Sequence, residues 1–178
     1  MTKYRVGMVH GRFQPFHKEH LEYVLSGIEK CDHCVIGITN PDPSELVLET
    51  TSSHRHRAES NPFTYFQRYE MVKQSLLDEG IDLRNISIVP FHLFHSIQWQ
   101  YYIPSPETIT QLVRVFSDWE LKKIGWLKDY GFTVIVIDEG VQKHITGTEV
   151  RHRMREGSNW KELVPNGTVK VIESSPIR

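Results

Sequence analysis

The first forty residues change their hydrophobic period in a way that predicts a strand, a loop and a helix. Apolar and polar residues alternate from Tyr4 to Val9, as in a strand, and the run ends at His10-Gly11. Apolar residues then recur at the spacing of one helix face, at Leu21, Val24, Leu25 and Ile28. A strand, a glycine-containing loop and a helix that begins near His17 are therefore expected in this order.

The same alternation of strand and helix patterns continues along the chain. Four more apolar runs have the length of strands: Cys34 to Thr39, Asn85 to Phe91, Leu112 to Phe116 and Thr133 to Ile137. Helical patterns lie between them at Thr64 to Glu79 and Trp119 to Tyr130, and Gly131 is placed to end the second. The expected fold is α/β, a doubly wound parallel sheet of about five strands with helices on both faces.

Two segments depart from this alternation. Residues Asn40 to Asn61 are rich in Pro, Ser, Thr and charge, and they exceed the usual connection of about 4–6 residues. Near the end, Thr146 and Glu149 have capping-box spacing before Val150 to Arg155, which predicts a short helix, and Trp160 to Ile172 predicts a short helical C-terminal tail. Because no repeat or linker is evident, residues 1–178 are expected to form a single domain.

Composition and charge exclude several classes of partner. The chain has 178 residues, 39% of them hydrophobic, with 21 Lys plus Arg against 22 Asp plus Glu. A formal net charge of −1 gives no global field that would attract nucleic acid or a membrane surface, so any anion site must be local. No apolar run approaches the roughly 18–20 residues of a membrane span, and Met1 to Tyr4 lacks a signal-peptide pattern. We therefore expect a cytoplasmic protein without nucleic-acid or membrane partners.

The two cysteines, Cys31 and Cys34, raise the question of redox or zinc chemistry. A structural zinc site needs four ligands, and no second CxxC or HxxxH completes the set. Cys34 leads directly into an apolar strand, which favours a small core residue. A thioredoxin-like redox pair is the alternative.

The segment Gly11 to His20 is the strongest candidate for chemistry. It joins the first strand to the first helix, where a parallel sheet binds ligands and where free N–H groups attract phosphate. His17 and His20 are three residues apart, so they share one helix face and both can donate to the same anion. A lone histidine is more often a cap or a core residue, but the pair beside Gly11, Arg12 and Pro15 favours a triphosphate site.

Two motifs in this chain resemble those of a known enzyme superfamily. The segment Gly11-Arg12-Phe13-Gln14-Pro15-Phe16-His17, with His20, resembles the signature of the HxGH nucleotidyltransferases, most closely the archaeal-type nicotinamide mononucleotide adenylyltransferases. Ile145 to Arg151 resembles the superfamily's late phosphate-binding motif, and further similarity lies at Asn61 to Thr64 with Arg68 and at Trp160 to Pro165. The resemblance implies a Rossmann-like sheet, Mg²⁺ as cofactor and the release of pyrophosphate.

The transfer reaction needs positioning and charge neutralisation but no protein base, because an acceptor phosphate or phosphonate is already ionised at neutral pH. His17 and His20 are expected to bind the triphosphate and the charge that develops on pyrophosphate, while Arg151 binds the outer phosphates. The other candidates for nucleotide binding are Gly11, Arg12, Phe13, Thr146, Gly147 and Thr148. Mg²⁺ is expected to arrive with the phosphates, so no metal ligand is assigned.

Two positions depart from the resembled pattern. Glu19 stands where the pattern has glycine, and its side chain is expected to change how closely the base or ribose approaches the helix. Ser117-Asp118-Trp119 stands where the adenylyltransferases carry a Gly-Asn pair. The nucleoside triphosphate, ATP or CTP, and the acceptor are therefore both left open.

A basic loop segment and an aromatic group are the candidates for acceptor binding. His54, Arg55, His56 and Arg57 place four anion donors in the long loop, although such a cluster is often only solvated. Trp99 is a candidate to stack on the acceptor or base, and its alternatives are a core position or a contact between copies of the chain. A homo-oligomer therefore also remains open.

Three functions fit these observations. The first is a nucleotidyltransferase of the nicotinamide mononucleotide adenylyltransferase type. The second is a CTP-dependent cytidylyltransferase that acts on a small phosphonate or phosphate ester, which Glu19, Asp118 and the basic loop favour. The third is a non-catalytic nucleotide-sensing domain, which predicts the loss of a phosphate ligand, although His17, His20 and Arg151 are all present.

Overall fold

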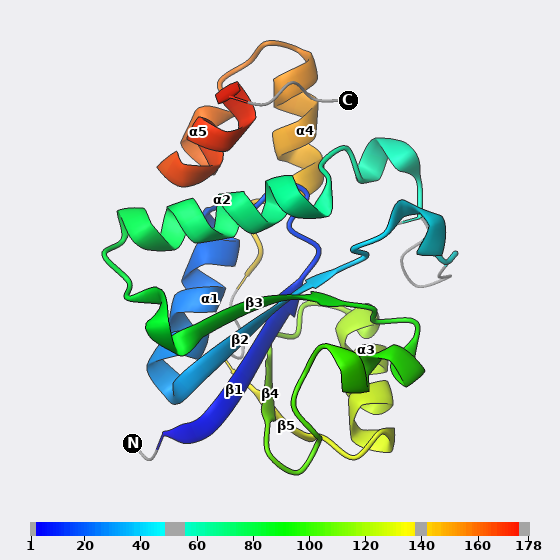
Figure 1. Ribbon diagram of the computed structural model, residues 1–178. Coiled ribbons are helices and arrows are strands. Elements are labelled where there is room, and N and C mark those ends of the chain that lie inside the picture. Colours follow the sequence, from blue (N-terminus) through cyan, green and yellow to red (C-terminus); the bar gives the residue numbers. More distant parts are fainter. Residues whose placement is uncertain (1–2, 49–55, 138–141, 175–178) are drawn as a thin grey trace.

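Five parallel strands form the sheet at the centre of the molecule (Figure 1). This computed structural model describes residues 3–48, 56–137 and 142–174. The strands are β1 (Tyr4–Gly11), β2 (Cys31–Thr39), β3 (Ile86–Phe91), β4 (Thr110–Val113) and β5 (Thr133–Val136). Their order across the sheet is β3-β2-β1-β4-β5, so the direction of winding reverses between β1 and β4. In sheets of this type, ligands bind outside the carboxyl ends of the strands at the reversal.

Helices cover both faces of the sheet. The helices α1 (Lys18–Lys30) and α2 (Tyr65–Asp78) pack on one face, and α3 (Asp118–Asp129) packs on the other (Figure 1). The chain ends with α4 (Gly147–Arg155) and α5 (Asn166–Ser174), and α5 packs along α2. Short 3₁₀ helices complete the list: η1 (Pro43–Glu45), η3 (Ala58–Ser60), η4 (Leu83–Asn85), η5 (Ser96–Tyr101) and η6 (Lys161–Leu163). The predicted doubly wound α/β fold is confirmed.

The central strand β1 is apolar on both faces, because helices cover each side of the sheet. Val9 is fully buried in the core on the α1 and α2 side, which also contains Met71. Its neighbour Met8 is fully buried in the core on the α3 side, which also contains Leu127. Packing from both sides holds the carboxyl end of β1, and the loop that follows it, in one position.

Two predicted boundaries differ from the structure. The predicted strand from Leu112 to Phe116 is wrong in its placement, because β4 ends at Val113 and Phe116 is 40% exposed beside a cavity. The predicted tail helix from Trp160 to Ile172 is instead divided into η6 and α5. Pro165 lies between them, since proline is tolerated at a helix start but not in a helix interior.

Both cysteines lie in the core on the α1 and α2 side. Cys31 is 4% exposed and Cys34 is 1% exposed, and the Cys31 thiol donates to the carbonyl of Gly27 at 3.1 Å. Cys34 is therefore the small core residue that the sequence predicted. None of the helices in the described ranges is both long and apolar enough to cross a membrane.

The contact of α5 with α2 generates a prediction at Gly167. A Cβ atom there would lie 2.5 Å from the carbonyl carbon of Gln74, so Gly167→Ala should lower the free energy of unfolding by about 1–3 kcal/mol through overpacking. The matched control is Gly125→Ala in α3, where a Cβ meets no atom within 4 Å, and this change should stabilise by roughly 0.5–1 kcal/mol. Urea denaturation of both variants measures the difference, and equal effects would contradict the close approach of the two helices.

Candidate active site

The loop between β1 and α1 lies at the reversal point of the sheet and is largely buried. Phe13 has a left-handed backbone with φ of 53°, a conformation that bulky residues adopt mainly at functional sites. Its ring is fully buried and meets the rings of Phe16 and His20 edge-on at 5.1 and 5.0 Å. The ring of Phe13 therefore supports His20, and because Phe13 also lines the cavity beside the two histidines, its expected role in nucleotide binding stays a prediction.

Three carbonyl groups of this loop accept hydrogen bonds from side chains of three different helices. Arg68 of α2 donates to the carbonyl of Arg12 at 2.9 Å, and Thr168 of α5 donates to that of Phe16 at 2.9 Å. The carbonyl of Gln14 accepts from Arg151 of α4 at 2.5 Å. A buried loop needs such partners, because unpaired backbone groups are costly away from water.

The helix α4 approaches the loop so closely that only glycine fits at its first position. A Cβ atom on Gly147 would lie 2.7 Å from the carbonyl oxygen of Gln14. The preceding residue, Thr146, caps the helix by accepting from the N–H of Glu149 at 3.1 Å. The amino-terminal end of α4 therefore faces the same space as the amino-terminal end of α1, which brings the two sequence motifs together.

His17 and His20 are adjacent at the start of α1. The backbone N–H of His17 donates to Nδ1 of His20 at 3.3 Å, and the two rings stack with centroids 3.4 Å apart. His17 is 1% exposed, and among the described residues neither of its ring nitrogens has a hydrogen-bond partner. Because buried polar groups are normally paired, an unpaired ring at this place indicates a site for a ligand.

The environment keeps His17 neutral. Burial, and secondly the positive charge of Lys143, lowers the pKa of His17 from 6.5 to about 3. A neutral imidazole carries one N–H donor and one acceptor nitrogen. At physiological pH, His17 can therefore offer a hydrogen bond to phosphate without a positive charge.

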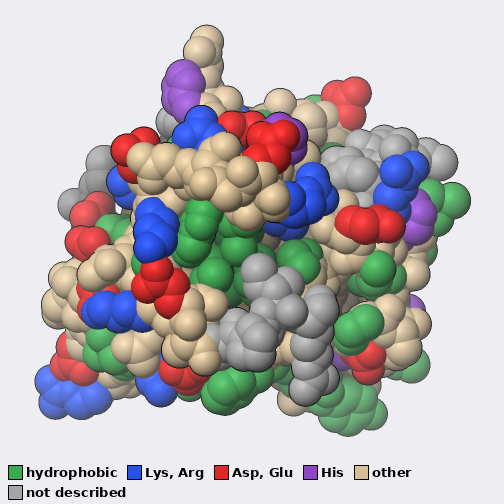
Figure 2. Space-filling model, turned by 90° about the horizontal axis from the view of Figure 1, so that it is seen from above, with side chains coloured by type: hydrophobic (Ala, Val, Ile, Leu, Met, Phe, Trp, Pro, Cys, Tyr) green, Lys and Arg blue, Asp and Glu red, His purple; other side chains and the backbone are tan. Residues whose placement is uncertain are grey.

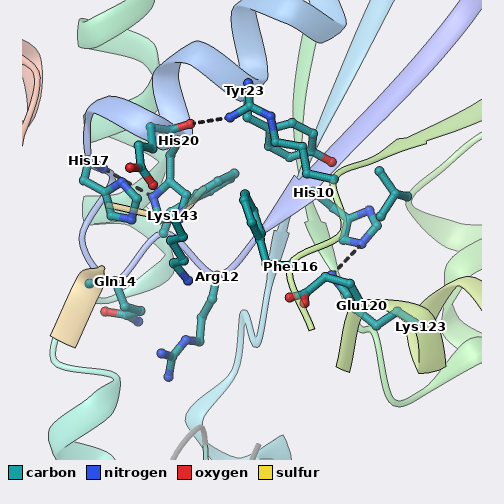
Figure 3. A pocket seen from close by; sticks show the side chains of 16 residues that line it. His10, Arg12, Gln14, His17, His20, Tyr23, Phe116, Glu120, Lys123 and Lys143 are labelled. Atoms are coloured by element: carbon teal, nitrogen blue, oxygen red, sulfur yellow. Dashed lines mark hydrogen bonds between the residues drawn. The ribbon is translucent and has the colours of Figure 1, made fainter. Parts of the chain in front are cut away.

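A cavity of about 130 Å³ opens beside the histidine pair (Figure 3). His17 and His20 lie on one side of it, and His10, Glu120 and Lys123 lie on the other, as Figure 3 shows. The described lining contains four cationic side chains and two carboxylates, namely Arg12, Arg114, Lys123, Lys143, Glu19 and Glu120. On the face drawn in Figure 2, by contrast, basic and acidic side chains are interspersed. The excess of positive charge in the cavity suits a polyanion such as a triphosphate.

Glu19 has a role that the sequence analysis did not anticipate. Its carboxylate accepts from the backbone N–H groups of His144 and Ile145 at 2.6 and 2.9 Å. The side chain therefore fixes the segment that leads into α4, although it also lines the cavity. We expected an effect on the approach of base or ribose, whereas these contacts identify a connection between the two motifs.

Arg151 is a structural residue as well as a candidate phosphate ligand. Besides the carbonyl of Gln14, its guanidinium donates to Oγ1 of Thr148 at 3.2 Å, and the side chain is 7% exposed. Burial, and then the charge of Arg155, lowers the pKa of Arg151 to about 10, so the group stays protonated at neutral pH. Phosphate binding by Arg151, Thr146, Gly147 and Thr148 stays a prediction, and Gly147 is the one of them that lines the cavity.

The predicted acceptor ligands are not brought together in the described residues. His54 and Arg55 lie outside the described ranges, and neither His56, half-buried, nor Arg57, exposed, lines the cavity. Arg12 does line it, and its guanidinium donates to the carbonyl of Ser60 at 3.1 Å.

Trp99 belongs to the core, which corrects the expectation that it stacks on a ligand. It is 2% exposed, and its indole N–H donates to the carbonyl of His92 at 2.8 Å. Its ring packs against Phe91 and Tyr130, with centroids 5.2 and 4.8 Å away. The sequence around Trp99 does not distinguish a ring packed in the core from a ring that stacks on a ligand, because both roles use the same aromatic side chains.

Several residues of the cavity were missed by the sequence analysis. His10 directly precedes Gly11 at the carboxyl end of β1, so its position at the end of a central strand was a usable signal. Tyr23, Lys123 and Lys143 also line the cavity, and no local pattern marks them. They reach the site only because α1, α3 and the segment before α4 converge there.

Sequence comparisons relate the whole chain to nucleotidyltransferases. The profile of the family described as cytidylyltransferase-like matches residues 8–175. The phosphonoformate cytidylyltransferase of Streptomyces viridochromogenes is 38% identical over 171 residues, which cover 96% of this chain and 92% of that protein. The nicotinamide-nucleotide adenylyltransferase of Saccharolobus solfataricus is 31% identical over 168 residues, which cover 93% of this chain and 88% of that protein.

Solved structures support the same fold. A bifunctional NMN adenylyltransferase/ADP ribose pyrophosphatase from Francisella tularensis superposes with a TM-score of 0.66 at 21% identity, covering 96% of this chain and 49% of the other. The chain therefore spans about half the length of that protein. At this level of identity the likeness shows the Rossmann-like fold, as the sequence predicted, and not the substrates.

The burial of His17 predicts how stability depends on pH. In the unfolded chain His17 binds a proton near pH 6.5, but in the folded chain it resists protonation down to about pH 3. The free energy of unfolding should therefore decrease as the pH falls below about 6.5, by up to about 1.4 kcal/mol per pH unit for this group. His10, whose pKa burial also lowers, should add to the effect.

Urea denaturation at several pH values between neutrality and mild acid measures this slope. His17→Gln should lower the slope of the free energy of unfolding against pH by the contribution of one titrating group, because the imidazole is removed. An unchanged slope in His17→Gln would show that His17 titrates normally in the folded protein.

Proposed function

Because the chain belongs to the cytidylyltransferase-like family of nucleotidyltransferases, we propose that it transfers a cytidylyl group from CTP to a small phosphonate or phosphate and releases pyrophosphate. The unpaired, buried ring of His17 at the amino-terminal end of α1, beside a basic cavity, is the observation that supports nucleotidyl transfer at this site. A nucleotide sensor without turnover would be expected to lack one of the phosphate ligands, whereas His17, His20 and Arg151 are all present.

The choice of acceptor rests on Trp99 and on the relatives. A nicotinamide ring needs a flat apolar surface to stack on, and Trp99, which the sequence analysis considered for stacking on the acceptor or base, is 2% exposed in the core. The similarity to the phosphonoformate cytidylyltransferase, at 38% identity, also favours a compact phosphonate. Transfer of an adenylyl group to nicotinamide mononucleotide is the second candidate, since relatives that carry that name reach 31% identity over 93% of the chain.

In the proposed reaction, an oxygen of the ionised acceptor attacks the α-phosphorus of the triphosphate. A bond forms between that oxygen and phosphorus, and the bond from the α-phosphorus to the bridging oxygen breaks, so the electron pair leaves with pyrophosphate. The acceptor carries no proton that must be removed, so no protein base is assigned. His17 and His20 donate hydrogen bonds to the phosphate oxygens, and the charge of Lys143 lies near the same end of the triphosphate.

Mg²⁺ is proposed as the cofactor, held mainly by the phosphates. Among the described residues, no three His, Cys, Asp or Glu side chains gather as a metal site, and Glu19 is already bonded to backbone N–H groups. The donor set therefore fits a metal that binds through the nucleotide, and the other carboxylate of the cavity lining, Glu120, accepts from the hydroxyl of Ser117 at 2.6 Å. When bound, Mg²⁺ neutralises phosphate charge during the transfer.

The organisation of the chain as a single domain and its cytoplasmic location stay predictions.

The substrate proposal predicts a specific preference. The specificity constant kcat/KM for CTP with phosphonoformate should exceed that for ATP with nicotinamide mononucleotide by at least about tenfold, because mismatched ligands leave buried polar groups unpaired. Release of pyrophosphate, measured with each of the four triphosphates and both acceptors, gives the values. A kcat/KM of about 10⁴ M⁻¹s⁻¹ for ATP with nicotinamide mononucleotide would contradict this preference and favour adenylyl transfer as the function.

A second prediction concerns His20. Replacement His20→Asn keeps an oxygen that can accept from the N–H of His17 but removes the imidazole, so folding should be retained. The loss of one preorganised donor should lower kcat by about 10²-fold, with a smaller change in KM for the triphosphate. Steady-state kinetics of the folded variant test this, and near-normal turnover would remove His20 from the transfer step.

A further inference from the structure

The cavity of about 130 Å³ beside His17 and His20 is called the nucleotide cavity below. A second, smaller cavity lies on the other side of β1. Its volume is about 30 Å³, and four residues line both cavities: His10, Gly11, Arg12 and Lys123. Its remaining walls come from the end of β2, at Thr39 and Asn40, from the segment after β3, and from Trp119 of α3. The two cavities therefore meet at the carboxyl end of β1, which is where a nucleotide and an acceptor would have to meet.

Lys123 is held at this junction by His10. The amine of Lys123 lies 3.5 Å from Nε2 of His10, and the two residues are 8% and 4% exposed. A dashed line marks this contact in Figure 3. Because an ammonium group has donors only, Nε2 must be the accepting nitrogen, which requires a neutral ring. Burial, and then the charge of Lys123, lowers the pKa of His10 well below its usual range, while Gln111 partly opposes this, so the ring is neutral.

The surroundings make His10 a rigid support for Lys123. The ring of His10 packs against Phe91, with centroids 5.3 Å apart, at the end of β3. His10 itself is fixed on the central strand, which is packed from both faces. An anion that enters either cavity can reach the Lys123 amine in a largely buried place, where interactions between charges are stronger than in water.

We propose that Lys123, positioned by His10, binds the anionic end of the acceptor in the second cavity, and that this cavity selects a compact phosphonate or phosphate. The inference rests on the proposed transfer reaction, because it places the acceptor next to the α-phosphate. A single water molecule needs roughly 10–15 Å³ of such volume, so the cavity holds a group of only a few atoms. The base and ribose of a mononucleotide exceed that space.

Binding without turnover tests the proposal separately from the reaction. Phosphonoformate is titrated by calorimetry into the protein with CTP and a chelator of divalent metals, so that transfer cannot proceed. Lys123→Met should weaken phosphonoformate binding by about tenfold or more, the usual effect of losing a charge-assisted hydrogen bond. The matched control is Lys122→Met on the exposed side of α3, where the amine lies 5.3 Å from the centre of the Trp126 ring, and binding should stay within about twofold.

The positioning role of His10 has its own test. His10→Leu removes the Nε2 atom that the Lys123 amine contacts, whereas His10→Gln keeps an oxygen at a similar reach. We expect His10→Leu to raise KM for the acceptor more than KM for CTP, and His10→Gln to restore most of the parent's value. Equal kinetics in the two variants would show that His10 acts only through packing.

The outcomes separate the two proposals. If phosphonoformate binds and Lys123→Met weakens it, but no pyrophosphate is released with any triphosphate, the proposed function fails and the anion site stands. If the parent releases pyrophosphate with phosphonoformate and Lys123→Met binds it like the parent, the site is wrong and the function stands. Absence of phosphonoformate binding to the parent, or equally tight binding of nicotinamide mononucleotide, would also overturn the proposed site.

Discussion

The structure depends on one constraint, which is that the polar backbone of a functional loop is buried between β1 and α1. Alternate carbonyl groups along this loop, at Arg12, Gln14 and Phe16, would each be costly without a partner. Side chains from α2, α4 and α5 provide those partners, and α2, α4 and α5 are far from the loop in sequence. The packing of the last helices is therefore a condition for the shape of the first motif.

This dependence explains why residues of the candidate site have two roles. Arg68 donates to the carbonyls of Thr39 and Asn40 as well as to that of Arg12, so it joins the carboxyl ends of β1 and β2. The amide side chain of Gln14 both donates to and accepts from the backbone of Phe63. The side chains proposed to bind ligand are therefore attached to a backbone that has few alternative conformations. Their positions are fixed before the ligand binds, so little conformational entropy is lost on binding.

Sequence patterns predicted the fold and the two motifs but not their joining. The succession of strands and helices along the chain and the site near His17 follow from local periodicity and from the place of the glycine loop, because both depend on near neighbours. Trp99 was ambiguous, because burial is decided by what packs over a ring and not by the ring's own neighbours in sequence. The place of Lys123 beside His10 and the bond from Glu19 to the segment before α4 depend on contacts over about a hundred residues, which no local pattern encodes.

Two buried, neutral histidines near the carboxyl end of β1 have different proposed tasks. On the nucleotide side, burial keeps His17 neutral, with a pKa of about 3, so it offers a dipole and not a full charge. A neutral donor binds the pyrophosphate product less tightly than a cation does, while it still stabilises the charge that develops in transfer. On the other side, the neutral ring of His10 accepts from Lys123 and so keeps its ammonium group at the junction of the two cavities. A small acceptor offers few contacts, so it needs the stronger attraction of that charge.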